Sequence, residues 1–182
     1  AGCHAGAKIS IKKREDTAME IRVARREDLQ QLLDIYNYEV VHGVATLDLQ
    51  PKSLEEWGQW FDAHNIKNHP LLVAEQAGRV AGYASLSPYR SKEAYRSTVG
   101  LSIYIGPDFR RQGVATALME AILREARQDP ETHTVVSVIT DGNEASRKLH
   151  EKFGFTYCGA IREVGMKFGA YQDILNFSLI VS

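Results

Sequence analysis

Hydrophobic and polar positions alternate with a period of two in several short stretches and recur every three to four residues in several longer ones. The first pattern predicts strands and the second predicts amphipathic helices. The predicted helices begin near Arg26, at Ser53, at Val114 and at Asn143. The predicted strands cover residues 20–24, 71–75, 79–87, 98–105, 133–140, 155–159 and 172–180. Helices and strands that intermingle in this order predict a mixed α/β fold.

Three local features refine this pattern. Residues 161–170, between the last two predicted strands, are rich in glycine and charge and are predicted to form a loop. Trp57, Trp60 and Phe61 recur at helical spacing, and we interpret them as a core or helix-packing face in preference to a ligand cage. Gly154 follows the last predicted helix, where a left-handed C-cap residue is expected.

Composition narrows the class of protein. A chain of 182 residues with 44% hydrophobic and 25% charged residues is typical of one ordinary globular domain. The 22 lysines and arginines nearly cancel the 23 aspartates and glutamates, so the charge balance disfavours nucleic acid as a partner. No apolar run approaches the roughly 20 residues that a membrane-spanning helix needs, so no membrane partner is expected.

The N-terminal segment differs from the rest. Residues 1–18 lack hydrophobic periodicity and are predicted to be a flexible extension, with Met19 as the natural start and residues 19–182 as the domain. Cys3 and Cys158 belong to no metal-ligand or disulfide spacing, which indicates a reduced cytoplasmic setting. Cys3 and His4 could be imagined as metal ligands, but we prefer a disordered terminus and predict no metal.

One segment carries a chemical signal of its own. Two arginines and a glycine lie at the junction of a predicted strand and a long predicted helix, in the run Arg110-Arg111-Gln112-Gly113-Val114-Ala115-Thr116. The first backbone N–H groups of a helix have no partner within it and lie at the positive end of the helix dipole. An anion is favoured there, so the segment is predicted to bind a phosphate group.

Two motifs in this context resemble the GCN5-related N-acetyltransferase (GNAT) superfamily over most of the chain from Met19 onward. They are Arg110-x-x-Gly113-x-Ala115 after a strand, and the block that runs from Asn143 through Ser146 and Leu149 to Phe155. The phosphinothricin acetyltransferase branch is resembled more narrowly in Ile35–Asn37, Trp60–Phe61, Gly82–Ser85 and Val164–Gly169. The resemblance implies a GNAT fold, with a single mixed sheet of about six or seven strands flanked by helices.

The resemblance also implies an N-acetyltransferase that uses acetyl-CoA as co-substrate and no metal. The backbone amides of residues 110–115, with Thr116 nearby, would hold the CoA pyrophosphate, and the side chains of Arg110 and Arg111 would add charge. The exposed backbone of Ile103, Tyr104 and Ile105 would pair with the pantetheine arm. Asn143 is expected to bond the pantetheine or the thioester region, with Ser146 near the cofactor. A simple helix N-cap would explain Asn143 equally well.

On the acceptor side, Arg90 and Glu93 align with positions that contact an amino-acid-like substrate in this branch. A guanidinium binds a carboxylate, and a carboxylate receives an ammonium. Without the resemblance, the two are an ordinary charged pair on a loop. Lys167 and Phe168 would border the same pocket or a dimer contact, and a homodimer is expected. His150 stands where many members carry a tyrosine that protonates the leaving thiolate; it is either a general acid or a histidine on the helix surface.

Gly100 departs from the pattern of the branch, which has a glutamate at this position as general base. An alkylammonium must lose a proton before its nitrogen can attack a thioester. Three readings follow: another carboxylate such as Glu93 or Glu163 takes the proton, water carries it out, or the activity is weak or lost. Gly100 could also permit a bulge that splits the sheet.

The leading hypothesis is acetyl transfer to the primary amine of a small amino-acid-like substrate, of the phosphinothricin or methionine sulfoximine type, by direct attack in a ternary complex. One alternative is a GNAT-fold module that binds acyl-CoA with weak or no catalysis, because of Gly100. Another is a peptide or protein N-terminal acetyltransferase, which needs an open groove. A nucleotide-phosphate site is disfavoured, since the turn lacks the Gly-x-x-x-x-Gly-Lys spacing.

Overall fold

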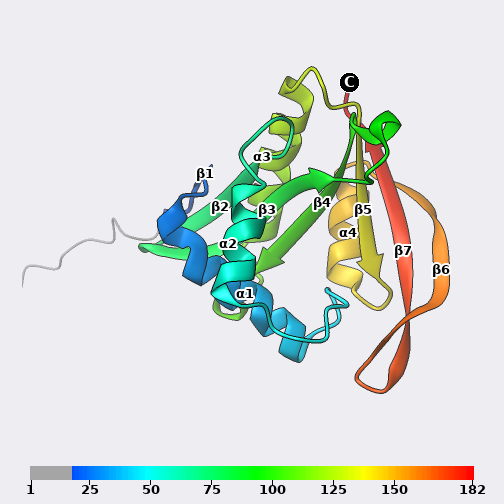
Figure 1. The fold of residues 1–182 in the computed structure, drawn as a ribbon, viewed down its shortest axis with the longest axis horizontal. Coiled ribbons are helices and arrows are strands. Elements are labelled where there is room, and N and C mark those ends of the chain that lie inside the picture. Colours follow the sequence, from blue (N-terminus) through cyan, green and yellow to red (C-terminus); the bar gives the residue numbers. More distant parts are fainter. Residues whose placement is uncertain (1–17) are drawn as a thin grey trace, which may run out of the picture.

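A single open β-sheet forms the centre of the computed structural model, which describes residues 18–182 (Figure 1). The strand order is β1-β2-β3-β4-β5-β7-β6. Among the described strands, β4 and β5 are the one parallel pair of neighbours. The strands are β1 (Glu20–Val23), β2 (Leu71–Gln76), β3 (Arg79–Pro88), β4 (Thr98–Ile105), β5 (Thr134–Thr140), β6 (Thr156–Lys167) and β7 (Ala170–Ile180). This architecture confirms the predicted mixed α/β fold, and its seven described strands agree with the six or seven expected.

Helices cover both faces of the sheet and bury a core on each. In the described part of the chain the α-helices are α1 (Leu29–His42), α2 (Leu54–Asp62), α3 (Val114–Gln128) and α4 (Glu144–Lys152). The helices α1 and α2 pack on one face, where Leu32 and Trp57 are buried. The helices α3 and α4 cover the other face, where Leu118 and Ile122 lie in the larger core. Removal of these apolar side chains from water stabilises the layered arrangement.

Local capping explains where the helices begin and end. The Ser53 hydroxyl accepts a hydrogen bond from the Glu56 N–H (3.2 Å), and the Glu56 carboxylate accepts one from the Ser53 N–H (2.7 Å). This capping box starts α2 at the predicted position. After α4, Gly154 has φ of 84°, which confirms the predicted left-handed residue at the helix end.

The predicted loop over residues 161–170 is wrong. The strand β6 continues to Lys167 and pairs with β7, so that the turn consists of Phe168 and Gly169 alone. The far half of this hairpin projects beyond the rest of the sheet (Figure 1). Most of its β6 side chains are exposed, and the register shifts between Ile161 and Gly165. Because neither face of this ribbon is steadily buried, its sequence shows no strand-like alternation.

Two further features bear on the predictions. In the described part of the chain, no helix is long and apolar enough to cross a membrane. The predicted extension over residues 1–18 lies outside the described residues, apart from Ala18, and so do the imagined metal ligands Cys3 and His4.

Candidate active site

A cleft opens where β4 and β5 separate. Residues 98–100 of β4 pair with residues 134–136 of β5, and the pairing ends there. Beyond this point a cavity of about 700 Å³ lies between residues 101–105 and 137–140, bordered by the start of α3 and by α4. The edge of β4 that faces β5 therefore has no strand partner from Leu101 to Ile105 in the described sheet. An extended ligand can fill such an edge by adding a strand.

The predicted anion site lies at one end of this cleft. Gly113 has φ of 81° and is the N-cap residue of α3. Ala117 donates its N–H to the Gly113 carbonyl at 3.1 Å, so the amides before it have no helical carbonyl to bond. Glycine is favoured here because this left-handed conformation strains any residue with a Cβ atom.

Six of the seven residues predicted for this site line the cleft, and their charges are not equally available. Arg111 is exposed and has no ion-pair partner within residues 18–182. Arg110 donates to the Glu39 carboxylate at 3.1 Å, which neutralises part of its charge. Gln112 does not line the cleft, and its side chain donates to the Asp108 carbonyl at 3.1 Å. The predicted anion site therefore offers backbone amides and one guanidinium, that of Arg111, without an ion-pair partner within residues 18–182.

Asn143 and Ser146 border the opposite side of the same cleft. The Asn143 side-chain oxygen accepts a hydrogen bond from the Ser146 N–H at 3.2 Å, so the N-cap interpretation of Asn143 is confirmed. The amide nitrogen of Asn143 is not used by this cap. Contact between Asn143 and a cofactor stays a prediction that the position of the residue allows.

His150 lines the cleft from α4 and is buried, so the interpretation as a helix-surface histidine is wrong. Its Nδ1 lies 2.7 Å from the Ser146 carbonyl oxygen. A carbonyl only accepts, so Nδ1 carries the proton and Nε2 of the neutral ring carries a lone pair. Burial lowers the pKa of His150, although the Ser146 carbonyl partly opposes this. The ring is therefore neutral at pH 7 and has no proton on Nε2 to give to a thiolate.

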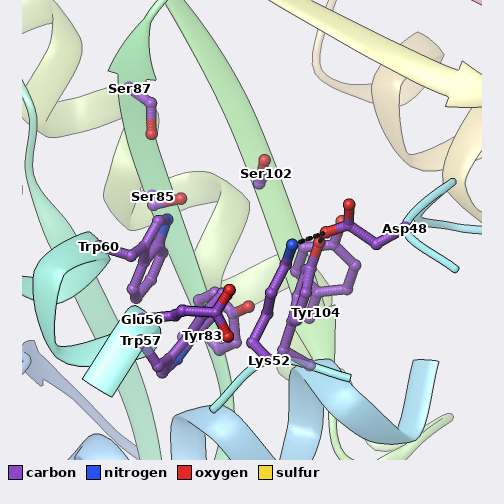
Figure 2. A pocket seen from close by; sticks show the side chains of 11 residues that line it. Asp48, Lys52, Glu56, Trp57, Trp60, Tyr83, Ser85, Ser87, Ser102 and Tyr104 are labelled. Carbon is purple, nitrogen blue, oxygen red and sulfur yellow. Dashed lines mark hydrogen bonds and ion pairs between the residues drawn. The ribbon is translucent and has the colours of Figure 1, made fainter. Parts of the chain in front are cut away.

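A second cavity, of about 350 Å³, lies on the other side of β4 (Figure 2). Trp57 and Trp60 form part of its wall, with ring centroids 4.3 Å apart, and Trp57 stacks on Tyr36 at 4.4 Å. These tryptophans belong to a helix-packing face, as predicted from their spacing, and they also border a cavity. The residues that line the cavity are Tyr36, Asp48, Lys52, Glu56, Trp57, Trp60, Tyr83, Ser85, Ser87, Ser102 and Tyr104.

Charged groups gather at one end of this second cavity. The Lys52 Nζ lies 3.5 Å from an Asp48 carboxylate oxygen (Figure 2), and the Tyr36 hydroxyl donates a hydrogen bond to the same carboxylate. Asp48, Lys52 and Glu56 are candidate functional residues that no sequence motif marks. Asp48 and Lys52 lie in the irregular segment between α1 and α2, where no periodicity marks which side chains face a cavity.

The two cavities meet at β4. Ser102 and Tyr104 line both of them, so a ligand in the cleft and a ligand in the second cavity would come together there. Burial raises the pKa of Tyr104 to about 12, which keeps its hydroxyl protonated at neutral pH. This geometry allows two ligands, one in each cavity, to approach each other at β4.

Gly100 lies beside this meeting point. It is the last residue of β4 that pairs with β5, and on its other side it faces Ser87 of β3. A Cβ atom at Gly100 would have only the Ser87 carbonyl oxygen near it, at 3.8 Å. A Cβ atom therefore fits at this position, and close packing does not require glycine.

The remaining predicted site residues do not line either cavity. Arg90 and Glu93 are exposed between β3 and β4, with the Arg90 guanidinium over the rings of Tyr89 and Tyr95. On the β6–β7 hairpin, Glu163 and Phe168 are exposed, whereas Lys167 is buried. The structure therefore does not bring these five residues into either cavity.

Comparison with known proteins agrees with this geometry. The acetyltransferase (GNAT) family matches residues 27–155. The L-amino acid N-acyltransferase MnaT of Escherichia coli is 36% identical over 161 residues, which are 88% of this chain and 93% of the relative. The phosphinothricin N-acetyltransferase of Streptomyces coelicolor is 37% identical over 159 residues, which are 86% of this chain and 92% of the relative.

A solved structure shows the same fold. It is a GNAT superfamily phosphinothricin acetyltransferase from Sinorhizobium meliloti in complex with acetyl-CoA, with a TM-score of 0.85 and 30% identity. The match covers 90% of this chain and 89% of that chain. The present chain therefore belongs to the acetyltransferase (GNAT) family, resembles its phosphinothricin acetyltransferase branch, and is an N-acetyltransferase.

Proposed function

We propose that this protein transfers the acetyl group of acetyl-CoA to the primary amine of a small amino-acid-like acceptor, by direct attack in a ternary complex. The observation that carries the proposal is the meeting of two cavities at Ser102 and Tyr104. One cavity has an anion site and an unpaired strand edge. The other is small, aromatic and charged.

The cleft between β4 and β5 fits the proposed co-substrate. The free amides at the start of α3, together with Arg111, suit a pyrophosphate. The open edge at Ile103, Tyr104 and Ile105 suits the amide groups of a pantetheine arm. Acetyl-CoA supplies an activated acyl group as a thioester, and the residues of this chain supply its binding and orientation.

The second cavity fits a small acceptor that carries an anionic group. Its volume of about 350 Å³ is at the lower end of the usual range for small-molecule sites. The Lys52 ammonium, oriented by Asp48, offers a cation to a carboxylate or a phosphinate. The relatives named for L-amino acids and for phosphinothricin support this class of acceptor. Contacts from Arg90 and Glu93 to the acceptor remain a proposal, supported by their place on the loop that follows β3.

An acceptor panel tests the proposal. Free thiol release from acetyl-CoA is followed with L-methionine sulfoximine, phosphinothricin, L-methionine, the amide of L-methionine and a short peptide with a free N-terminus. We expect turnover with the amino-acid-like acceptors and a higher KM for the amide. Lys52→Met should raise KM for the acids much more than for the amide. Preference for the peptide, or release no faster than hydrolysis for every amine, would contradict the proposal.

We also propose that the protein is a homodimer. Apolar side chains on the projecting β6–β7 hairpin are exposed, among them Ile161, Val164, Met166, Phe168 and Tyr171. An exposed apolar patch on an edge strand is typical of an interaction surface. Sedimentation equilibrium should give twice the monomer mass, and Val164→Lys combined with Met166→Lys should shift the protein to monomers. A monomeric wild-type protein would contradict the proposal.

We also propose that the protein is cytoplasmic. Residues 19–182 are proposed to form a single catalytic domain. Cys158 is an exposed free thiol, which suits a reducing compartment. Both cores pack on one continuous sheet, which supports a single domain.

A further inference from the structure

His64 is a buried histidine with a defined tautomer next to the proposed acceptor cavity. It follows α2 and is 7% exposed. Its Nδ1 lies 2.7 Å from the Trp60 carbonyl oxygen, which can only accept, so Nδ1 carries the proton. Its Nε2 lies 2.8 Å from the Ser87 Oγ. With a lone pair on Nε2, the Ser87 hydroxyl must be the donor in this second hydrogen bond.

Ser87 connects this histidine to the proposed acceptor cavity. It lines the acceptor cavity together with Ser85 and Ser102 (Figure 2). Ser87 and Gly100 are directly opposed on neighbouring antiparallel strands, so their side-chain positions share one face of the sheet. Gly100 is in turn the residue at which β4 and β5 separate. The Ser87 hydroxyl therefore lies beside the place where a glutamate at position 100 would extend.

We propose that Ser87 and His64 form a proton relay that replaces the carboxylate absent at Gly100. The inference rests on the proposed function, because it needs an amine that attacks a thioester. In this relay Ser87 contacts the acceptor nitrogen, and His64 acts through Ser87 by holding the hydroxyl proton and receiving it.

The proton balance of the step is complete. The acceptor first loses one proton to water, which leaves a neutral amine. Its lone pair forms the C–N bond with the thioester carbonyl carbon, and the nitrogen becomes positive. Ser87 Oγ takes a proton from this nitrogen while its own proton moves to His64 Nε2. The carbonyl re-forms, the C–S bond breaks, and the electron pair leaves on sulfur. The thiolate is protonated through solvent as His64 gives up its proton, so the products are an amide and free CoA thiol.

The surroundings of His64 favour a neutral ring that can accept a proton. Burial lowers the pKa of His64, the Trp60 carbonyl raises it by less, and His69 on the same loop lowers it further. No charged group of α2, β3 or β4 within the described residues adds to these effects. Above pH 6.5 the ring is therefore available as a base. The N–H becomes much more acidic as the nitrogen attacks, so a neutral imidazole that acts through Ser87 can accept its proton.

Kinetics of four variants test the relay. Ser87→Ala and His64→Gln should each lower kcat by roughly a hundredfold, the usual effect of losing general base catalysis. The Kd for acetyl-CoA, measured by calorimetry, should stay that of the wild type and shows that the variants are folded. His133→Gln is the matched control, because His133 also bonds a serine, Ser182, but lies outside both cavities. In the His64→Gln background, Gly100→Glu should recover at least tenfold in kcat.

The pH profile distinguishes a relay from a structural role. For the wild type, log kcat/KM should fall with unit slope below the pKa of the amine and with a slope of two below the pKa of His64. In His64→Gln the slope should stay at one. A wild type that acetylates no amine overturns both the proposed function and the relay. Turnover with unchanged kcat and slope in both relay variants overturns the relay alone. An acetyl group found on Ser87 by mass spectrometry also overturns it, since Ser87 would then be a nucleophile.

Discussion

Lys167 donates a hydrogen bond from its Nζ to the backbone carbonyl of Thr46 at 2.8 Å, across 121 positions of sequence. The contact joins the tip of the β6–β7 hairpin to the irregular segment between α1 and α2, two residues before Asp48. Burial lowers the pKa of Lys167, and attraction to Glu39 and Asp48 opposes this effect. The hairpin therefore supports the segment that carries the charged end of the proposed acceptor cavity.

Replacement of Lys167 by methionine should loosen this segment. The Thr46 carbonyl would lose its partner in a buried setting, which costs about 1–3 kcal/mol of unfolding free energy. We expect the KM for the acceptor to rise, because Asp48 and Lys52 would be less well held. Urea unfolding and steady-state kinetics measure the two effects. Lys148→Met, on the exposed face of α4, is the control, and equal unfolding free energies for both variants would contradict the prediction.

The left-handed glycine before α3 allows a matched test of the anion site. Gly113 and Gly78 have φ of 81° and 71°, and a Cβ atom at either position would meet nothing within 4 Å. Alanine should therefore cost each position about 1–2 kcal/mol of unfolding free energy through backbone strain alone. Only Gly113→Ala should weaken acetyl-CoA binding, by about tenfold, because Gly113 lines the cleft and Gly78 does not. Calorimetry that gives both variants the same Kd would count against the predicted site.

Two substitutions at Asn143 distinguish its role as a helix cap from a role in cofactor binding. Asn143→Ala should lower the unfolding free energy by about 1 kcal/mol, because the Ser146 N–H loses its acceptor. Asn143→Asp keeps a cap oxygen and should retain the stability of the wild type. We expect this second variant still to bind acetyl-CoA about tenfold more weakly, since a carboxylate cannot donate a hydrogen bond. If Asn143→Asp binds as tightly as the wild type, Asn143 is a helix cap alone.

The sheet, and the turn and helix start that carry the predicted anion site, could be predicted from the sequence because they depend on local signals. Three features are contiguous in the sequence: the strand before Gly106, the glycine turn, and the amphipathic pattern from Val114 to Gln128. The hydrophobic period predicts the strand and the helix, and the glycine predicts the turn. The cap at Ser53 is local in the same way. Such features require no knowledge of which distant segments come together.

The proposed acceptor cavity could not be predicted, because it is assembled from five separate segments, the first of which is α1 with Tyr36. Asp48 and Lys52 come from an irregular connection, the tryptophans from α2, and the serines from β3 and β4. His64 and Ser87 are 23 positions apart and are joined only by the fold. His150 is an instructive error: its position on a polar helix indicated the surface, but Phe155 and Phe177 pack on its ring. The burial and the partners of these side chains depend on contacts between segments that are distant in the sequence.

A buried ion pair near the start of the domain gives the last prediction, which concerns stability alone. Arg22 donates two hydrogen bonds of 2.8 Å to Asp28, which is 3% exposed. Burial raises the pKa of Asp28, but the hydrogen bonds from Arg22 and the Arg25 backbone outweigh this and hold it below its usual value. The ionised carboxylate therefore contributes stability that is present above pH 4 and is lost as the pH falls through the lowered pKa.

Arg22→Met should turn the ionised Asp28 carboxylate from a stabilising group into a destabilising one. Without the guanidinium, burial would dominate and raise the pKa of Asp28, so the charged form would cost about 3 kcal/mol of unfolding free energy at pH 7. Protonation of Asp28 removes that cost, and the difference between variant and wild type should shrink as the pH is lowered from 7 to 4. Urea unfolding at both pH values measures it. Arg147→Met breaks the exposed pair with Glu151 and should change the unfolding free energy by less than about 1 kcal/mol. A difference for Arg22→Met that is equally small, or that grows on acidification, would show that Asp28 is not held ionised by Arg22.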